Sequence, residues 1–138
     1  KSQYIYKLFL FSSTTNKSLN LSMKLYALIA AAKNPKDGNV YIYSREYSLS
    51  DFGIFYRNKV KESFKFLCRE SIPFITKDKG TRQSVQHEDQ FFVHMLVSDM
   101  DNMAVFAFCD TEYPRRVAYK CLEEFMTKFN SKVGIGYQ

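Results

Sequence analysis

The stretch KLYALIAAAKNPKDGNVYIYSRE, residues 24–46, places two runs of β-forming residues on either side of a turn. The first run, KLYALIAAA, is apolar at both alternating sets of positions, which is typical of a strand buried on both faces. Within NPKDG, Pro35 presets φ and Gly38 tolerates a left-handed conformation. The second run, NVYIYSREY, again has the composition of a strand. These residues therefore predict a β-hairpin whose first strand is buried.

The rest of the chain predicts a helix, three strands and a second helix. Residues 48–70, SLSDFGIFYRNKVKESFKFLCRE, have a helical pattern, with Ser48 or Ser50 as the N-cap and Asp51 in the first turn. SIPFITKDKGTR lies between this helix and the next strands, and its charged part, KDKGTR, is expected to be a loop. The predicted strands are SVQHE, FFVHMLVSD and MAVFAFC. An Asp-Asn turn in DMDNM joins the last two. A final helix is expected over about residues 113–130.

The predicted order of elements is β-β-α-β-β-β-α, in which hairpins dominate and βαβ units are absent. Such an order predicts an α+β fold with a five-stranded antiparallel sheet flanked by helices. The length of 138 residues suits one domain, which we assign to residues 23–138. We interpret residues 1–22 as an N-terminal extension or linker, either natural sequence upstream of Met23 or an artificial tail. A signal peptide is the alternative for this segment.

The charge and the cysteines restrict the class of protein. The net charge is +6, but residues 1–22 hold three lysines and no acid, leaving 17 basic against 14 acidic residues elsewhere. We therefore expect no nucleic-acid partner. The three cysteines are an odd number without a CxxC pair, which indicates a reducing compartment and neither a disulfide framework nor structural zinc. His87 and His94 add no ligand spacing, so no metal or cofactor is expected.

The first helix has an apolar arc wider than contact with one sheet requires. On a helical wheel Phe55 and Phe66 lie along one edge of this arc, eleven residues or about three turns apart. The central core face consists of Phe52, Tyr56, Val60, Phe64 and Leu67. Two interpretations are open. The helix is seated deeply in the core, or its edge lines a groove that takes an apolar partner such as a helix or a lipid.

The cysteines do not indicate a catalytic nucleophile. Cys121 is centred on an apolar stripe of the last helix, together with Val117, Phe125 and Phe129. A thiol buried there is expected to have a raised pKa and to be inert. Cys68 and Cys109 have no general base beside them in the sequence.

The charged cluster before the last helix is better explained by helix capping than by catalysis. Asp110 and Glu112 precede Pro114, and acids and proline both favour a helix start. Arg115 and Arg116 either pair with these acids or bind an external acid, and a solvated or capping role is preferred. His94 is expected to be a satisfied or half-exposed strand residue. We find no catalytic triad or carboxylate pair, and we do not expect an enzyme.

Three motifs resemble the longin domain of a lipid-anchored R-SNARE, a synaptobrevin homologue of the YKT-six type. They are MKLYALIAA from Met23, KGTRQSV from Lys79 and DTEYPRRVAY from Asp110. Their order and spacing match the family pattern over about residues 23–130. The longin, or profilin-like, fold of that family agrees with the order of elements derived above.

The resemblance implies a regulatory domain in vesicle membrane fusion and in ER, Golgi and vacuolar transport. Such a domain folds over its own SNARE segment and its prenyl or acyl lipid, which keeps a closed soluble state. Its further partners are other SNAREs and, through the lipid anchor, the membrane. It is cytoplasmic and cycles to the cytosolic face of secretory-pathway membranes. Phe66 matches the family's key aromatic residue in the groove for lipid and SNARE core, and Phe55, Val60 and Phe64 are supporting candidates.

This chain departs from the complete family pattern. It contains no heptads, no central-layer arginine of a SNARE motif and no CaaX sequence, so we expect it to be the regulatory domain of a longer protein. One alternative is a longin-like subunit of a coat adaptor or tethering complex that acts as a protein-binding scaffold. Another is a thioester-using acyltransferase, which requires a reactive Cys68, Cys109 or Cys121.

Overall fold

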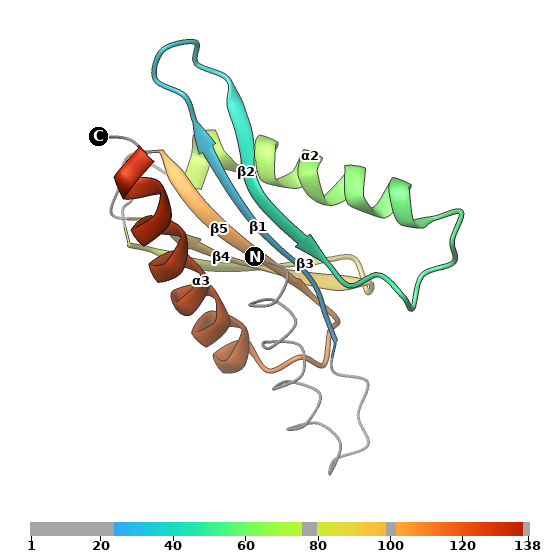
Figure 1. Cartoon of the computed structure of the whole chain (residues 1–138). Helices are drawn as coiled ribbons and strands as arrows, with labels where there is room; N and C mark the ends of the chain where they lie inside the picture. Colours follow the sequence, from blue (N-terminus) through green and yellow to red (C-terminus); the bar gives the residue numbers. More distant parts are fainter. Residues whose placement is uncertain (1–23, 76–79, 99–101, 137–138) are drawn as a thin grey trace.

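A computed structural model describes residues 24–75, 80–98 and 102–136 of the chain. Residues 1–22, and parts of the predicted KDKGTR loop and DMDNM turn, lie outside the described residues. The elements follow the predicted order (Figure 1). They are β1 (Leu25–Lys33), β2 (Val40–Tyr47), α2 (Arg57–Ile75), β3 (Arg82–His87), β4 (Phe91–Val97), β5 (Met103–Cys109) and α3 (Arg115–Gly136).

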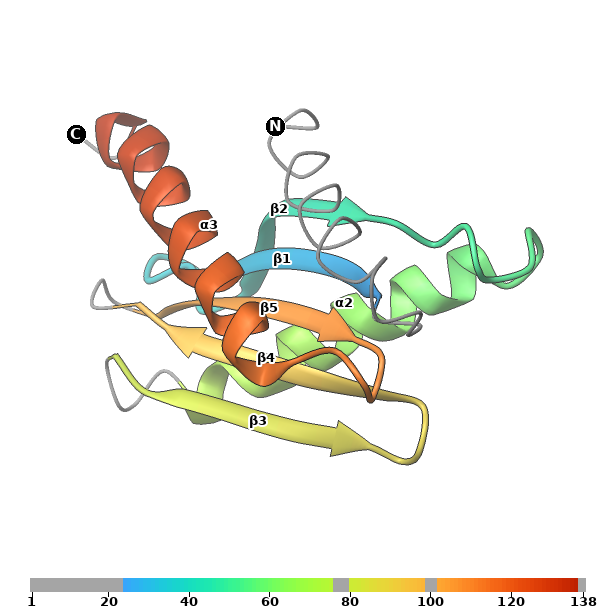
Figure 2. The same ribbon diagram turned by 90° about the horizontal axis from the view of Figure 1, so that it is seen from below.

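The strands form one antiparallel sheet in the order β2-β1-β5-β4-β3. The central strand, β5, pairs with β1, which comes from a distant part of the sequence. Helix α2 covers one face of the sheet and α3 covers the other, as Figures 1 and 2 both show. The predicted α+β class and the five-stranded antiparallel sheet are therefore confirmed.

Both faces of the central strands are buried. Leu28 of β1 and Val105 of β5 belong to the cluster packed against α3. Their sequence neighbours Ile29 and Phe106 belong to the cluster packed against α2. Every residue of β5 is buried. The prediction that the first strand of the hairpin is buried on both faces is confirmed, because successive side chains of a strand point to opposite faces.

The first helix begins later than the sequence predicts. The segment between β2 and α2 forms separate turns, in which Phe52 N–H donates to the Leu49 carbonyl at 3.0 Å. The Arg57 side chain donates to the carbonyls of Phe52 (3.1 Å) and Ser50 (3.4 Å). These bonds occupy carbonyls that a helix would use, and Gly53 weakens a helix there. The predicted start near residue 48, with Ser48 or Ser50 as the cap, is therefore wrong.

The same helix also ends later than predicted, since residues 71–75 continue it beyond the expected end at residue 70. Pro73 lies inside this last turn and removes one helical hydrogen bond, which costs about 3 kcal/mol. Ile72 is fully buried and Ile75 packs against the same cluster. Each buried side chain of this size contributes about 1.5–3 kcal/mol, so packing on the sheet offsets the proline.

The last helix runs to residue 136, beyond the predicted end near 130. At its start, the Pro114 carbonyl accepts a bond from Ala118 N–H at 3.0 Å, as expected for proline at a helix entry. The Asp110 carboxylate accepts bonds from Glu112 N–H (3.1 Å) and Lys24 N–H (3.0 Å). It therefore closes the turn before α3 and ties that turn to the beginning of β1.

Candidate functional site

An apolar groove lies between α2, the β3–β4 turn and the entrance to β1. It has a volume of about 1090 Å³. Its walls are mainly aromatic and aliphatic, and they include Tyr26, Phe52, Val60, Phe66, Leu67 and Phe91. The described part of the chain contains no helix long and apolar enough to cross a bilayer.

The floor of the groove is a set of packed rings. Phe64 is buried and stacks on Phe108 of β5 with 4.1 Å between ring centroids. It also meets Phe91 of β4 edge-on at 5.3 Å. His87, in the last position of β3, stacks on Phe91 at 5.0 Å. Three of these rings come from strands and Phe64 comes from α2, so the floor consists of packed side chains from the helix and the sheet.

The rim of the groove is more exposed and partly charged. Tyr26 and Phe52 meet edge-on at 5.1 Å on one side. On α2 the Phe66 ring keeps 59% of its surface exposed. The Glu62 carboxylate forms an ion pair with Lys65 at 2.7 Å, and the hydrogen bond from Lys65 lowers the Glu62 pKa. A large exposed ring beside an apolar floor, with charges further out, is typical of a site for an amphipathic or apolar partner.

Three of the four residues predicted from the sequence line this groove. Val60 and Phe66 form its wall, and Phe64 forms its floor. Phe55 does not line it and is 95% exposed in the loop before α2. The predicted helical edge joining Phe55 to Phe66 is wrong, because α2 begins only at Arg57.

The sequence reasoning missed the half of the groove that lies outside α2. Tyr26 comes from β1, His87 from the end of β3 and Phe91 from the start of β4. No local pattern marks these residues as neighbours of Phe66. Only the strand order, which places β4 and β1 on either side of β5, brings them under the same helix.

The three cysteines are all buried, as expected for Cys121. Burial raises the pKa of the Cys68, Cys109 and Cys121 thiols. None of them lines the groove. Within the described residues, no cluster of three or more His, Cys, Asp or Glu side chains is placed to hold a metal ion. The groove therefore contains none of the three thiols, and its lining is mainly apolar surface.

His94 differs from its expected environment. It is 1% exposed, and its Nδ1 atom lies 2.7 Å from Ser84 Oγ. Its Nε2 atom has no hydrogen-bond partner within the described part of the chain. Burial, and secondarily the charge of Arg115, lowers the His94 pKa to about 4. The residue is therefore neutral and only partly satisfied, whereas the sequence predicted a satisfied or half-exposed histidine.

Comparison with known proteins gives the family. The family model for the longin, or regulated-SNARE-like, domain matches residues 49–136. The chain is 30% identical over 112 residues to the VAMP-like protein YKT61 of Arabidopsis thaliana, covering 81% of this chain and 54% of the relative. It is 36% identical over 110 residues to the synaptobrevin homolog YKT6 of Yarrowia lipolytica, covering 77% and 52%.

A third relative is the putative synaptobrevin homolog YKT6 of Dictyostelium discoideum. It is 37% identical over 83 residues, which cover 57% of this chain and 40% of the relative. The chain thus spans about half the length of the curated relatives it matches. The family match, the sheet order and the placement of both helices agree, and the chain belongs to the longin family of regulated-SNARE-like domains.

Proposed function

We propose that this chain is the regulatory domain of a lipid-anchored R-SNARE and that the α2 groove covers an apolar segment of the full-length protein. The occupants are the protein's own SNARE segment and an attached prenyl or acyl chain. With the groove filled, the protein is closed and soluble. With the groove empty, it is open to other SNAREs and to the cytosolic face of secretory-pathway membranes.

The observation that carries this proposal is the exposed Phe66 side chain beside a floor of packed aromatic rings. A lipid chain that buries about a dozen CH₂ groups gains on the order of 10 kcal/mol before the cost of ordering, at about 0.8 kcal/mol per group. This energy is comparable to what the same chain gains in a membrane. The groove and the membrane therefore compete for the lipid chain. Release of the chain from the groove is a shift from the closed to the open population.

The names of the relatives favour this function over the scaffold alternative. The proteins compared above are named as VAMP-like or as synaptobrevin homologues, and none of these names describes a coat adaptor or tethering subunit. The domain is assigned to residues 23–138, with residues 1–22 as an extension. No catalytic role is proposed, since all three thiols are buried and burial raises their pKa.

The test is a titration of the chain with a farnesylated cysteine methyl ester, followed by amide NMR shifts. We expect the shifts to cluster on α2 and on the start of β4. Phe66→Glu should weaken binding at least about tenfold, because it places a charge on the apolar wall. Phe55→Glu is the matched control, since Phe55 is exposed but does not line the groove. Shifts that avoid α2, or unchanged binding by Phe66→Glu, would overturn the proposal.

A further inference from the structure

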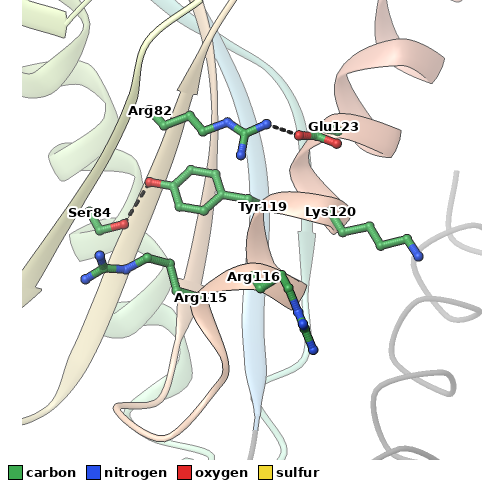
Figure 3. A pocket seen from close by; sticks show the side chains of 7 residues that line it. All are labelled: Arg82, Ser84, Arg115, Arg116, Tyr119, Lys120 and Glu123. Carbon is green, nitrogen blue, oxygen red and sulfur yellow. Dashed lines mark hydrogen bonds and ion pairs between the residues drawn. The ribbon is translucent and has the colours of Figure 1, made fainter.

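A basic pocket lies on the opposite face of the sheet, between β3 and the first turns of α3. Its volume is about 820 Å³. Figure 3 shows its lining, which holds four cationic side chains, one carboxylate and two hydroxyls. These residues are Arg82, Arg115, Arg116, Lys120, Glu123, Ser84 and Tyr119. The apolar groove lies beside α2, so the two sites share no lining residue.

Most of this positive charge is not neutralised by the protein. Glu123 forms an ion pair with Arg82, whose guanidinium also lies over the Tyr119 ring at 5.3 Å from its centroid. Arg115, Arg116 and Lys120 have no ion-pair partner among the residues that the structure describes. Three cations are therefore available to an external anion.

The two arginines at the start of α3 are also not held by Asp110. The Asp110 carboxylate is occupied by the backbone N–H groups of Lys24 and Glu112. In Figure 3 Arg115 extends toward Ser84, whereas Arg116 and Lys120 extend from the outer side of α3. Arg116 and Lys120 are four residues apart and so lie on one side of the helix. The helix thus presents two separate groups of cations, which suits a ligand with more than one anionic group.

The hydroxyl groups in the pocket are connected to the buried His94. Ser84 Oγ lies 2.7 Å from His94 Nδ1 and 2.7 Å from Tyr119 Oη. His94 Nε2 is buried without a partner within the described chain, and an orphaned acceptor is less costly than an orphaned donor. The favoured tautomer therefore has the proton on Nδ1, which donates to Ser84. Ser84 then donates to Tyr119, and the Tyr119 proton is free for an anion in the pocket.

We propose that this pocket binds the phosphate monoesters of an anionic lipid headgroup, of the kind carried by phosphorylated inositol. The guanidinium fork matches phosphate oxygens in a bidentate geometry, and the tyrosine hydroxyl adds a neutral donor. The cations lie on exposed surfaces of a helix and an edge strand, where a membrane headgroup can reach them. The choice of a lipid over a free phosphate compound rests on the membrane role proposed above.

The first experiment compares three kinds of phosphatidylcholine vesicle in a flotation assay with the whole chain. One contains phosphorylated phosphatidylinositol, the second contains phosphatidylserine at matched surface charge, and the third contains no anionic lipid. Soluble inositol trisphosphate and a phosphoserine peptide are titrated in parallel. We expect binding to the first vesicle and to inositol trisphosphate. In ¹⁵N NMR spectra we expect the His94 ring of the free chain to be the Nδ1–H tautomer, and a ring protonated on Nε2 would contradict the proposed donor role of Tyr119.

Variants then separate recognition from simple charge attraction. Arg116→Gln/Lys120→Gln should weaken binding by roughly tenfold to thirtyfold. The control Lys33→Gln/Lys36→Gln removes the same charge from exposed positions at the far β1–β2 turn and should bind normally. Arg115→Lys/Arg116→Lys keeps the charge but loses the planar fork, and we expect it to weaken binding severalfold.

A change in the opposite direction completes the test. Glu123→Gln removes the pocket's one lining carboxylate and releases Arg82 from its ion pair, so it should strengthen binding. Equal binding to charge-matched phosphatidylserine, or equal loss in the Lys33/Lys36 control, would overturn the phosphate site. Binding of inositol trisphosphate without vesicle binding, or a tighter phosphoserine peptide, would overturn the lipid source. Because these variants leave the α2 groove intact, the farnesyl titration reports separately on the proposed function.

Discussion

The ring of Phe64 on α2 stacks on the ring of Phe108 on β5, with 4.1 Å between their centroids and 19° between their planes. Both side chains are buried. Phe66 is only two residues further along α2, yet its ring is 59% exposed at the groove. The helix thus places one ring in the core and one at the groove, and their contributions to stability can be separated by experiment.

Phe64→Ala should lower the free energy of unfolding by about 3–5 kcal/mol, because it leaves a cavity between α2 and the sheet. Phe66→Ala should change it by less than about 1 kcal/mol, since the ring is largely exposed. Urea denaturation followed by circular dichroism measures both. A comparable loss for the two variants would mean that Phe66 also supports the fold.

Stability should fall as the pH decreases from 7 to 5, because of His94. Its pKa is lowered from 6.5 to about 4 in the folded protein, so in this range the unfolded chain binds a proton that the folded chain does not. The expected loss in the free energy of unfolding is about 2 kcal/mol. His94→Gln should remove most of this loss, and the exposed His87 provides the control His87→Gln. Identical pH profiles for the wild type and His94→Gln would contradict the assignment.

Asp110→Ala should destabilise the entry to α3 and the first residue before β1. The substitution removes the acceptor of two backbone hydrogen bonds, from Lys24 and Glu112, at a cost of about 1–3 kcal/mol. Burial raises the Asp110 pKa despite these bonds, so part of the cost is offset by removing a poorly solvated carboxylate. Hydrogen exchange should accelerate at the Lys24 and Glu112 amides. Thr111→Ala, at an exposed neighbouring position, should leave both amides protected.

The cysteines should be nearly inert in the native state. Cys68, Cys109 and Cys121 are buried, and burial raises the pKa of each thiol. A thiol reagent at neutral pH should label them at least about a hundredfold more slowly than in urea, because the reactive thiolate is scarce and inaccessible. Mass spectrometry counts the labels. Rapid native labelling of any one thiol would reopen the acyltransferase alternative.

The sequence alone predicted the strands and turns that are specified by a local pattern of residues. Continuous apolar runs, with apolar residues at both alternating sets of positions, mark β1 and β5 as strands buried on both faces, and the turn residues Pro35 and Gly38 mark the first hairpin. Together these features gave the correct order and class. The predicted boundaries of the first helix were less accurate. Arg57 binds carbonyls of the preceding loop, and packing on the sheet stabilises α2 beyond Pro73.

Only the tertiary structure determines the composition of the groove and of the basic pocket. The resemblance to the longin family suggested Val60, Phe64 and Phe66, which all lie on one helix and line the groove. The sequence could not place Phe91 beneath that helix or join Arg82 to the start of α3, since strand pairing brings these distant segments together. Local periodicity determines which side of a helix or strand is apolar, whereas long-range packing determines which other elements that side contacts.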